Sequence, residues 1–198
     1  MTILGLSKTI IWGDYMELNE IFEEIRDLWL NEDNVDSKLS QQDIDSLISC
    51  EKHIENPEKI KRNFDIDLTQ KRFSMMLFAN DFPDIKFKMD IRISTIAPEN
   101  FSVVLTLLNV YKNICLYRCN GPHNEPNNTL HTEHHTHTLT INDLIDNRLS
   151  QPDYREKANY HSLTGAISYF VTKCNIIGIE NILPRELGNI NQIGLEEI

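Results

Sequence analysis

The clearest pattern along the chain is a strict alternation of apolar and polar residues over positions 85–93, which read IKFKMDIRI. A period of two is typical of a β-strand with one face in the core and the other in water. Three more segments with strand character lie at residues 73–78, 101–110 and 114–119. The links between these four segments are short. They therefore predict antiparallel neighbours, because parallel strands need crossovers of about a dozen residues or more.

Helical periodicity precedes these strands. Residues 16–30 carry apolar side chains at spacings of three and four, which predicts an amphipathic helix. Ser40, followed three residues later by Asp43, has the pattern of a helix N-terminus. We expect this second helix to run to about Glu55, because Pro57 cannot continue it.

After the four strands the period changes again. Residues 130–139 alternate like a fifth strand, and Thr140 with Asp143 predicts the cap of a short helix. Asp153 with Glu156 predicts the start of a last helix. The apolar stripe of that helix consists of Leu163, Ile167, Phe170 and Cys174.

Together these segments predict an α+β fold, in which an antiparallel meander of four to five strands packs against N- and C-terminal helices. We expect an acidic helical segment at residues 1–58 and an α+β domain at residues 59–198, joined in one compact unit. A chain of 198 residues buries enough surface to fold without a disulfide or a metal.

Composition restricts where the protein works. No apolar run approaches the roughly 20 residues that cross a bilayer, so we expect no membrane partner. The four cysteines are scattered and the first residues lack the features of a signal peptide, which predicts free thiols in a reducing cytoplasm.

The formal charge of −11 is unevenly distributed. Residues 14–58 contain 14 acidic and three basic side chains, whereas residues 59–118 contain six acidic and ten basic ones. This asymmetry argues against a protein that coats nucleic acid generally, but it leaves room for a site-specific nuclease. It also favours an alternative: the acidic helices imitate nucleic acid and bind a protein partner.

Five of the seven histidines lie within 15 residues of one another. His135 and His137 are two apart in a predicted strand, so their side chains share a face with Cβ atoms about 6.5–7 Å apart. His123 follows an Asn-Gly-Pro turn that can fold it back over the strand, and Glu133 continues the same face. We interpret His131, the remaining member of that face, as surface.

These residue types support two kinds of chemistry. His123, His135 and His137 can hold zinc, manganese or iron with an open position for water, and Glu133 can accept the proton of that water. In the second kind no metal takes part: one histidine is the general base and another the general acid. Arg118 then offsets the phosphate charge.

Each histidine also has an ordinary interpretation, because a polar strand face tolerates His as solvated surface. His134 is assigned to the opposite strand face, and His53 and His161 to helices. Lys112 is a second cation near the cluster. No P-loop, GxGxxG, GxSxG, HExxH or paired CxxC pattern occurs, which argues against the commonest nucleotide-driven, Rossmann, α/β-hydrolase and zinc-protease classes.

One stretch carries a resemblance. Residues 116–126 read LYRCNGPHNEP, a His-Thr-His sequence follows at 135–137, and an earlier helix opens with LSQQD at Leu39. This pattern resembles the bacterial and phage family DUF6978 over about residues 39–139, with the departure that Glu125 separates Asn124 from Pro126. The layout is also similar to that of small toxins from toxin–antitoxin pairs. Both resemblances imply a mobile-element or defence setting and a functional role for the three histidines.

The sequence therefore leads to one principal hypothesis and two alternatives. The principal one is a metal-assisted or histidine-based phosphodiester hydrolase acting on nucleic acid. The first alternative is a non-catalytic inhibitor or adaptor that binds a nuclease or another protein through residues 14–58. The second is a structural protein that a metal ion stabilises.

Overall fold

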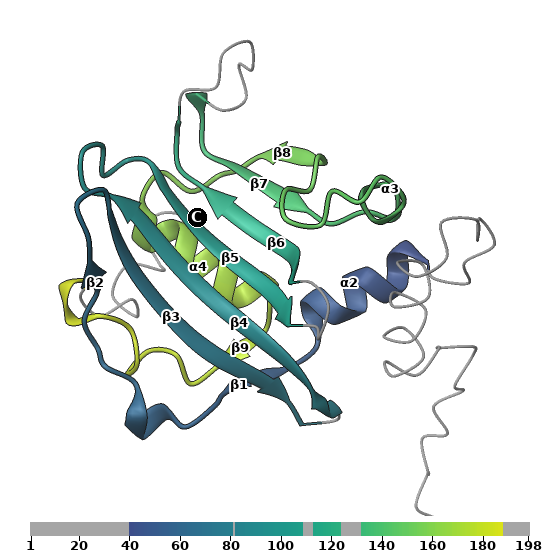
Figure 1. Ribbon diagram of the computed structural model, residues 1–198, viewed down its shortest axis with the longest axis horizontal. Coiled ribbons are helices and arrows are strands. Elements are labelled where there is room, and N and C mark those ends of the chain that lie inside the picture. Colours follow the sequence, from purple (N-terminus) through teal and green to yellow (C-terminus); the bar gives the residue numbers. More distant parts are fainter. Residues whose placement is uncertain (1–39, 81, 109–112, 124–131, 188–198) are drawn as a thin grey trace, which may run out of the picture.

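The computed structural model describes residues 40–80, 82–108, 113–123 and 132–187, and Figure 1 shows their arrangement. A nine-stranded sheet runs in the order β8-β7-β6-β5-β4-β3-β1-β9, with β2 beside β3. The strands are β1 (Lys52–Ile54), β2 (Asp65–Ile66), β3 (Gln70–Ala79), β4 (Phe82–Ser94), β5 (Phe101–Leu108), β6 (Ile114–Asn120), β7 (His135–Thr138), β8 (Arg155–Lys157) and β9 (Ile176–Ile177). The helices are α2 (Gln41–Ser49), α3 (Ile141–Ile145) and α4 (Leu163–Lys173), with 3₁₀ turns at Pro57–Lys59 and Arg185–Leu187.

The predicted meander is confirmed, since β3 to β7 are consecutive antiparallel neighbours. The α+β class is confirmed as well, although the sheet is wider than expected. Helix α3 carries the expected cap, in which Thr140 and Asp143 bond reciprocally. The helix expected at residues 16–30 lies outside the described residues. Within the described residues, no helix is long and apolar enough to span a membrane.

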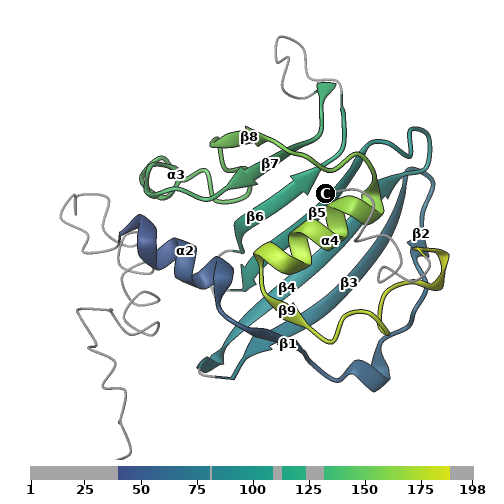
Figure 2. The same cartoon turned by 180° about the vertical axis from the view of Figure 1, so that it is seen from behind.

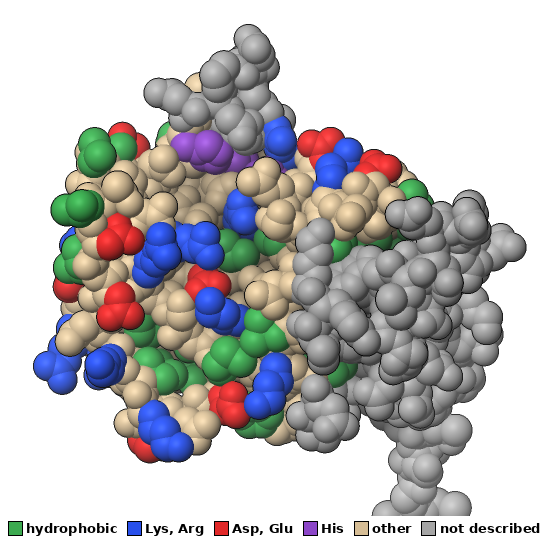
Figure 3. All heavy atoms as spheres, in the orientation of Figure 1, with side chains coloured by type: hydrophobic (Ala, Val, Ile, Leu, Met, Phe, Trp, Pro, Cys, Tyr) green, Lys and Arg blue, Asp and Glu red, His purple; other side chains and the backbone are tan. Residues whose placement is uncertain are grey.

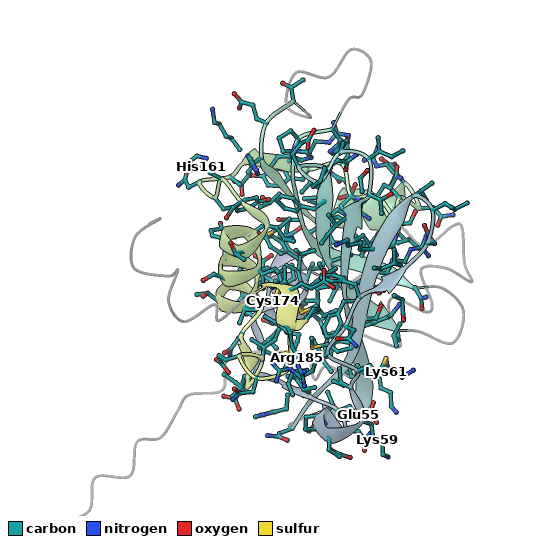
Figure 4. All side chains as sticks on the ribbon, turned by 90° about the vertical axis from the view of Figure 1, so that its left-hand side faces the viewer. Glu55, Lys59, Lys61, His161, Cys174 and Arg185 are labelled. Carbon is teal, nitrogen blue, oxygen red and sulfur yellow. The ribbon has the colours of Figure 1, made fainter. Side chains whose placement is uncertain are left out.

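Helix α4 lies across one face of the sheet (Figure 2), and the edge-on view separates the two layers clearly (Figure 4). Ile167 and Phe170 of this helix are fully buried against the strands, where Phe87 and Leu105 are also fully buried. The expected apolar stripe therefore forms the core contact. No described helix lies across the middle of the opposite face, which we call the open face.

Two helix boundaries predicted from the sequence are wrong. Helix α2 has the capping box expected of Ser40 and Asp43, but it ends at Ser49 rather than near Glu55. The backbone leaves the helical region at Cys50, where ψ is 149°. The next residues form β1, which pairs with β3 on one side and β9 on the other. Sheet pairing thus overrides the helical spacing of Ile54.

The second error concerns the start of the last helix. Asp153 and Glu156 do not cap it; Glu156 belongs to β8, which pairs with β7. Helix α4 begins after Ser162, whose hydroxyl accepts a hydrogen bond from the Gly165 amide at 3.1 Å. A three-residue strand of charged side chains has no hydrophobic periodicity, so only its pairing with β7 reveals it.

A buried lysine joins the ends of two helices. The Lys52 ammonium is fully buried and donates to the carbonyls of Ile48, Cys50 and Cys174 at 2.8, 2.9 and 3.2 Å. It also lies 4.9 Å from the ring centroid of Phe87. Helix C-termini carry partial negative charge, so one cation stabilises the ends of α2 and α4 together. Burial lowers the pKa of Lys52.

Candidate functional site

Strand pairing places a histidine between two arginines. His137 on β7 lies directly opposite Arg118 on β6 and Arg155 on β8. Directly opposed residues of antiparallel strands point to the same face, so these three side chains form one row. The next row consists of Asn120, His135 and Lys157. Both rows lie on the open face.

The three histidines expected to act together do lie together. The ring centroids of His135 and His137 are 5.0 Å apart, and those of His123 and His135 are 5.1 Å apart. His135 therefore lies between the other two rings. We predicted that His135 and His137 on one strand would cluster with His123 from the preceding loop. The observed ring positions agree with that prediction.

Backbone carbonyls fix the orientation of each ring. Nδ1 lies 2.8 Å from the Glu133 carbonyl in His135, 2.7 Å from that of Pro152 in His137, and 3.0 Å from that of Gly121 in His123. A carbonyl only accepts, so each Nδ1 carries a proton and donates. In a neutral ring the lone pair is then on Nε2, and that of His135 faces the Asn120 side-chain amide at 3.2 Å.

The turn that returns His123 to the sheet requires a glycine. A Cβ added to Gly121 would lie 1.9 Å from the Glu99 carbonyl oxygen and 2.8 Å from the Phe101 ring. The Gly121 amide also donates to the Phe101 carbonyl at 2.9 Å. Any side chain at this position would force the loop away from β5, so this glycine helps to place His123 beside His135.

His137 is held in its neutral form. Its side chain is 6% exposed, and burial is the main cause that lowers its pKa to about 4. The positive charges of Arg118 and Arg155 act in the same direction, whereas the hydrogen bond to Pro152 opposes them. At neutral pH, Nε2 of His137 therefore carries a lone pair, which is the protonation state that a general base requires.

The two flanking arginines have donors that the described residues do not satisfy. The Nε atoms of Arg118 and Arg155 are buried and have no hydrogen-bond partner. Elsewhere on each guanidinium, Arg118 donates to the Ser150 carbonyl at 3.2 Å and Arg155 lies 3.4 Å from the Asp153 carboxylate. A buried donor without an acceptor costs about 1–3 kcal/mol, so an oxygen acceptor that reached these two donors would be stabilised there.

A buried carboxylate organises the segment that completes this site. Asp143 is fully buried and accepts from the Thr140 amide and hydroxyl, from the Arg148 guanidinium and from the Asp153 amide. Burial alone would raise its pKa, but these donors outweigh burial and lower it. The network fixes residues 148–153, from which the Pro152 carbonyl reaches His137.

The remaining residues expected at the site have different positions. The Glu133 carboxylate is about half exposed and pairs with Lys157 at 2.9 Å, so this residue meets His135 only through its backbone carbonyl. His134 faces the other side of the sheet, beside Phe101 and Tyr160. Its ring centroid is 6.1 Å from that of His161, which Figure 4 shows on the helix side.

Several expectations fall on residues outside the described ranges. These are His131, Lys112 and the first part of the acidic segment at residues 14–58. The described remainder of that segment, from Ser40 onward, contributes α2 and β1 to the fold. The three imidazoles themselves are described in full, so their geometry carries the interpretation of the site.

Positive charge and hydrogen-bond donors lie close to His137 and His135. In the described part of the chain, no three His, Cys, Asp or Glu side chains are grouped so that they could hold a metal ion. Two guanidinium groups beside His137 repel a cation, and the Asn120 amide faces Nε2 of His135. The same groups attract phosphate, because guanidinium and amide donors match its oxygens.

Two residues of the site were not singled out from the sequence. Arg155 lies in a segment interpreted as the start of a helix, and Asn120 was noted only as part of a turn motif. The signal for Asn120 was its position two residues from Arg118, which places both on one strand face. For Arg155, no local signal existed.

Comparison with known proteins identifies a family that matches this chain. A family model described as "Family of unknown function (DUF6978)" matches residues 39–176, which extends the expected resemblance beyond Leu139 and past α4 to the first residue of β9. No curated protein and no solved structure matches the chain. The match covers more than half of the sequence and includes all the residues of the site described above. The chain therefore belongs to the DUF6978 family.

Proposed function

We propose that this protein is a histidine-based phosphodiesterase whose reacting phosphate binds between Arg118 and Arg155, next to His137. The observation that carries the proposal is the row Arg118–His137–Arg155, in which a neutral imidazole lies between two cations with unsatisfied Nε donors. Metal-assisted hydrolysis was the other version of the hypothesis. The two guanidinium groups favour the version without a metal, because they bind the phosphate directly.

The chemical step uses the two outer rings of the cluster. Nε2 of His137 accepts a proton from the attacking hydroxyl group, whose oxygen forms the new bond to phosphorus. The bond from phosphorus to the leaving oxygen breaks, and that oxygen takes a proton from His123 in its charged form. Arg118 and Arg155 balance the charge on the phosphoryl oxygens. His135 positions both rings, since it contacts each of them.

Substrate binding also improves His137 as a base. In the unliganded site, the two arginines help to lower its pKa to about 4. A phosphate brings negative charge between them, which offsets their effect on the imidazole and raises its pKa toward the usual value. A base whose pKa lies nearer the working pH transfers protons more effectively. The free thiols of the described cysteines agree with a cytoplasmic setting, which remains part of the proposal.

The proposal is tested with two chromogenic diesters, bis(4-nitrophenyl) phosphate and uridine 3′-(4-nitrophenyl phosphate), in buffer that contains EDTA. We expect turnover of at least one diester, and we expect His137→Ala to lower kcat/KM by about 100-fold or more. Arg118→Gln and Arg155→Gln should each lower it by about 10-fold or more. Arg185→Gln removes an exposed arginine from another part of the fold and should not change it.

The controls separate the possible failures. His134→Ala removes a histidine on the opposite face of the sheet from the proposed phosphate and should keep turnover. Turnover that appears only when zinc or manganese replaces EDTA would contradict the histidine-based mechanism and favour the metal-assisted one. Turnover of neither diester under either condition would refute the phosphodiesterase proposal.

A further inference from the structure

The open face extends the candidate site into a continuous polar row. Residues directly opposite one another on six successive strands share this face. The row, from β3 to β8, consists of Arg72, Arg92, Ser102, Asn120, His135 and Lys157. Neighbouring strands lie about 4.8 Å apart, so the row is about 24 Å long. All six side chains are polar, and four of them carry or can carry positive charge. Arg72, Arg92 and Lys157 are exposed, whereas Asn120 and His135 are buried.

The charge on this face is predominantly positive, although the whole chain is acidic. Figure 3 shows Lys and Arg side chains over the middle of the face and near β7 and β8, with histidine between these groups. Asp90 on this face is already bonded to Lys88 at 2.9 Å, and Asp65 on β2 lies directly opposite Arg72. Two cations of the row also have carboxylate partners, since Arg72 lies 3.6 Å from Asp67 and Lys157 lies 2.9 Å from Glu133. Within the described residues, Arg92 and Arg118 take part in no ion pair with a carboxylate. These two cations are available to an external anion.

A hollow lies at the β3–β5 end of the row. Its volume is about 340 Å³, and Arg92, Ser102, Asn100 and Gln70 supply polar groups to its lining. Ile96, which is 84% exposed, adds an apolar wall. A cation, several hydrogen-bonding groups and one apolar surface together match a nucleotide, which has a phosphate, hydroxyl groups and a flat base.

We propose that the open face binds single-stranded RNA, with the scissile phosphate at Arg118, His137 and Arg155 and a neighbouring nucleotide in the Arg92 hollow. This inference rests on the proposed function and adds its substrate class. Arg92 on β4 and His137 on β7 are three strands apart and lie in rows two residues apart, so roughly 16 Å separates the hollow from the reacting site. An extended strand can therefore contact both.

Two features favour RNA over DNA. The site provides imidazoles and guanidiniums, so the nucleophile has to come from water or from the substrate, and an RNA 2′-hydroxyl is held next to the phosphate that it attacks. Ser102, which follows Arg92 in the row and is half-buried, can exchange a hydrogen bond with a 2′-hydroxyl group.

The test measures RNA affinity apart from catalysis. The probe is a fluorescein-labelled single-stranded RNA of about twelve nucleotides, within the usual site sizes of single-strand binders. Fluorescence anisotropy is recorded in EDTA with full-length protein that carries His137→Gln, which prevents turnover of the probe. We expect Arg92→Glu in this background to weaken binding about tenfold or more and to reduce the slope of log K against log salt by about 0.7.

The matched control reverses a charge on the opposite side of the sheet. Lys173 is exposed near the end of α4, so Lys173→Glu changes net charge by the same amount and should leave affinity within about twofold. Arg92→Gln, whose circular dichroism and Tm should equal those of the parent, checks that the Glu variant does not act by unfolding the chain.

Each outcome decides between the two proposals. Equal RNA affinity for the Arg92→Glu variant and the parent would overturn the proposal that the open face binds RNA, even if the diesters are cleaved. Equal affinity for a DNA strand of the same sequence would overturn the assignment to RNA. The Arg92 variants could lose RNA affinity while the wild-type protein cleaves neither diester. That result would support RNA binding by the open face and refute the proposed catalysis.

Discussion

Each of the two faces of the sheet carries a histidine, but the two histidines lie in different environments. On the face under α4, His134 lies between Phe101 and Tyr160, and the fully buried Phe170 fills the core. On the open face, His137 lies between two arginines with unsatisfied donors. Among the described residues, the two buried side-chain donors without a partner therefore belong to the open face. This difference teaches that the environment of a histidine, rather than its presence in a cluster, indicates its role.

The faces are nevertheless connected. The Tyr160 hydroxyl lies on the helix side, and it is 2.7 Å from the His135 carbonyl and 3.0 Å from the Asn120 carbonyl. It therefore holds the backbone of two strands whose side chains form the open-face rows. Burial raises the pKa of Tyr160, so this hydroxyl stays protonated and keeps donating. Packing on one face thereby fixes the geometry on the other.

The largest expected effect tests whether stability comes from the helix face. Phe170→Ala should lower the free energy of unfolding by about 3–5 kcal/mol, because it removes a fully buried ring from the core. Lys86→Ala on the open face should change it by less than about 0.5 kcal/mol, since its ion pair with Glu55 is exposed. Urea denaturation measures both values. Similar losses for the two variants would contradict the contrast between the faces.

The next prediction concerns the buried ammonium of Lys52, which has hydrogen-bond acceptors within the chain. Lys52→Met should destabilise the protein by about 2–3 kcal/mol, because three carbonyls at the ends of α2 and α4 lose their donor. Diester turnover at a temperature where the variant stays folded should be retained. Thermal denaturation, with the exposed Lys173→Met as control, gives the comparison. A variant as stable as its parent would show that the ammonium makes no net contribution to the free energy of unfolding.

A pH titration sharpens the description of the open face. The folded-state pKa of His137, about 4, lies below the value near 6.5 expected in the unfolded chain. Between these two values the unfolded chain binds a proton that the folded chain excludes, so stability falls as the pH decreases from about 6.5 to 4. The loss from this group reaches up to about 3 kcal/mol.

His137→Gln removes this titration while keeping a side chain that can donate to Pro152. Its unfolding free energy should therefore vary less between pH 6.5 and 4 than that of the wild-type protein. Urea denaturation at several pH values measures both curves. Identical curves would show that His137 titrates normally in the folded chain.

The smallest effect concerns the Thr140–Asp143 cap, which lies beside the proposed phosphate site. Thr140→Ala should lower stability by about 1 kcal/mol, because the Asp143 carboxylate loses the hydroxyl that lies 2.7 Å away. Asp143 keeps its bonds to Arg148 and to the Asp153 amide, so diester turnover should fall by no more than a few fold. If turnover falls by more than a few fold while stability falls by only about 1 kcal/mol, the cap itself controls the position of Pro152.

Prediction from the sequence succeeded where neighbouring residues decide the structure. The alternation over residues 85–93 identified β4, and the capping patterns at Ser40 and Thr140 identified the starts of α2 and α3. The spacing of His135 and His137 correctly indicated a shared face. Each of these signals depends on residues at most a few positions apart, because strand and helix geometry repeat over that distance.

Elsewhere the prediction failed for a common reason. Lys52 and Arg155 lie in segments whose local pattern indicated helices, yet both lie in strands. Their pairing partners are distant in sequence, since β1 contacts β9 more than 120 residues later, at Ile176. Such pairing depends on how much surface the assembled sheet buries and satisfies, and no local window contains that information.

The amino-acid sequence alone therefore determined that this chain forms an antiparallel α+β domain and that two histidines share a strand face, because side-chain direction along a strand is a local property. Only the tertiary structure decided that Arg118 and Arg155 flank His137 and that Lys52 is buried between two helix ends. Register between distant strands sets those neighbours, and the neighbours in turn determine the protonation state and charge that give the site its chemistry.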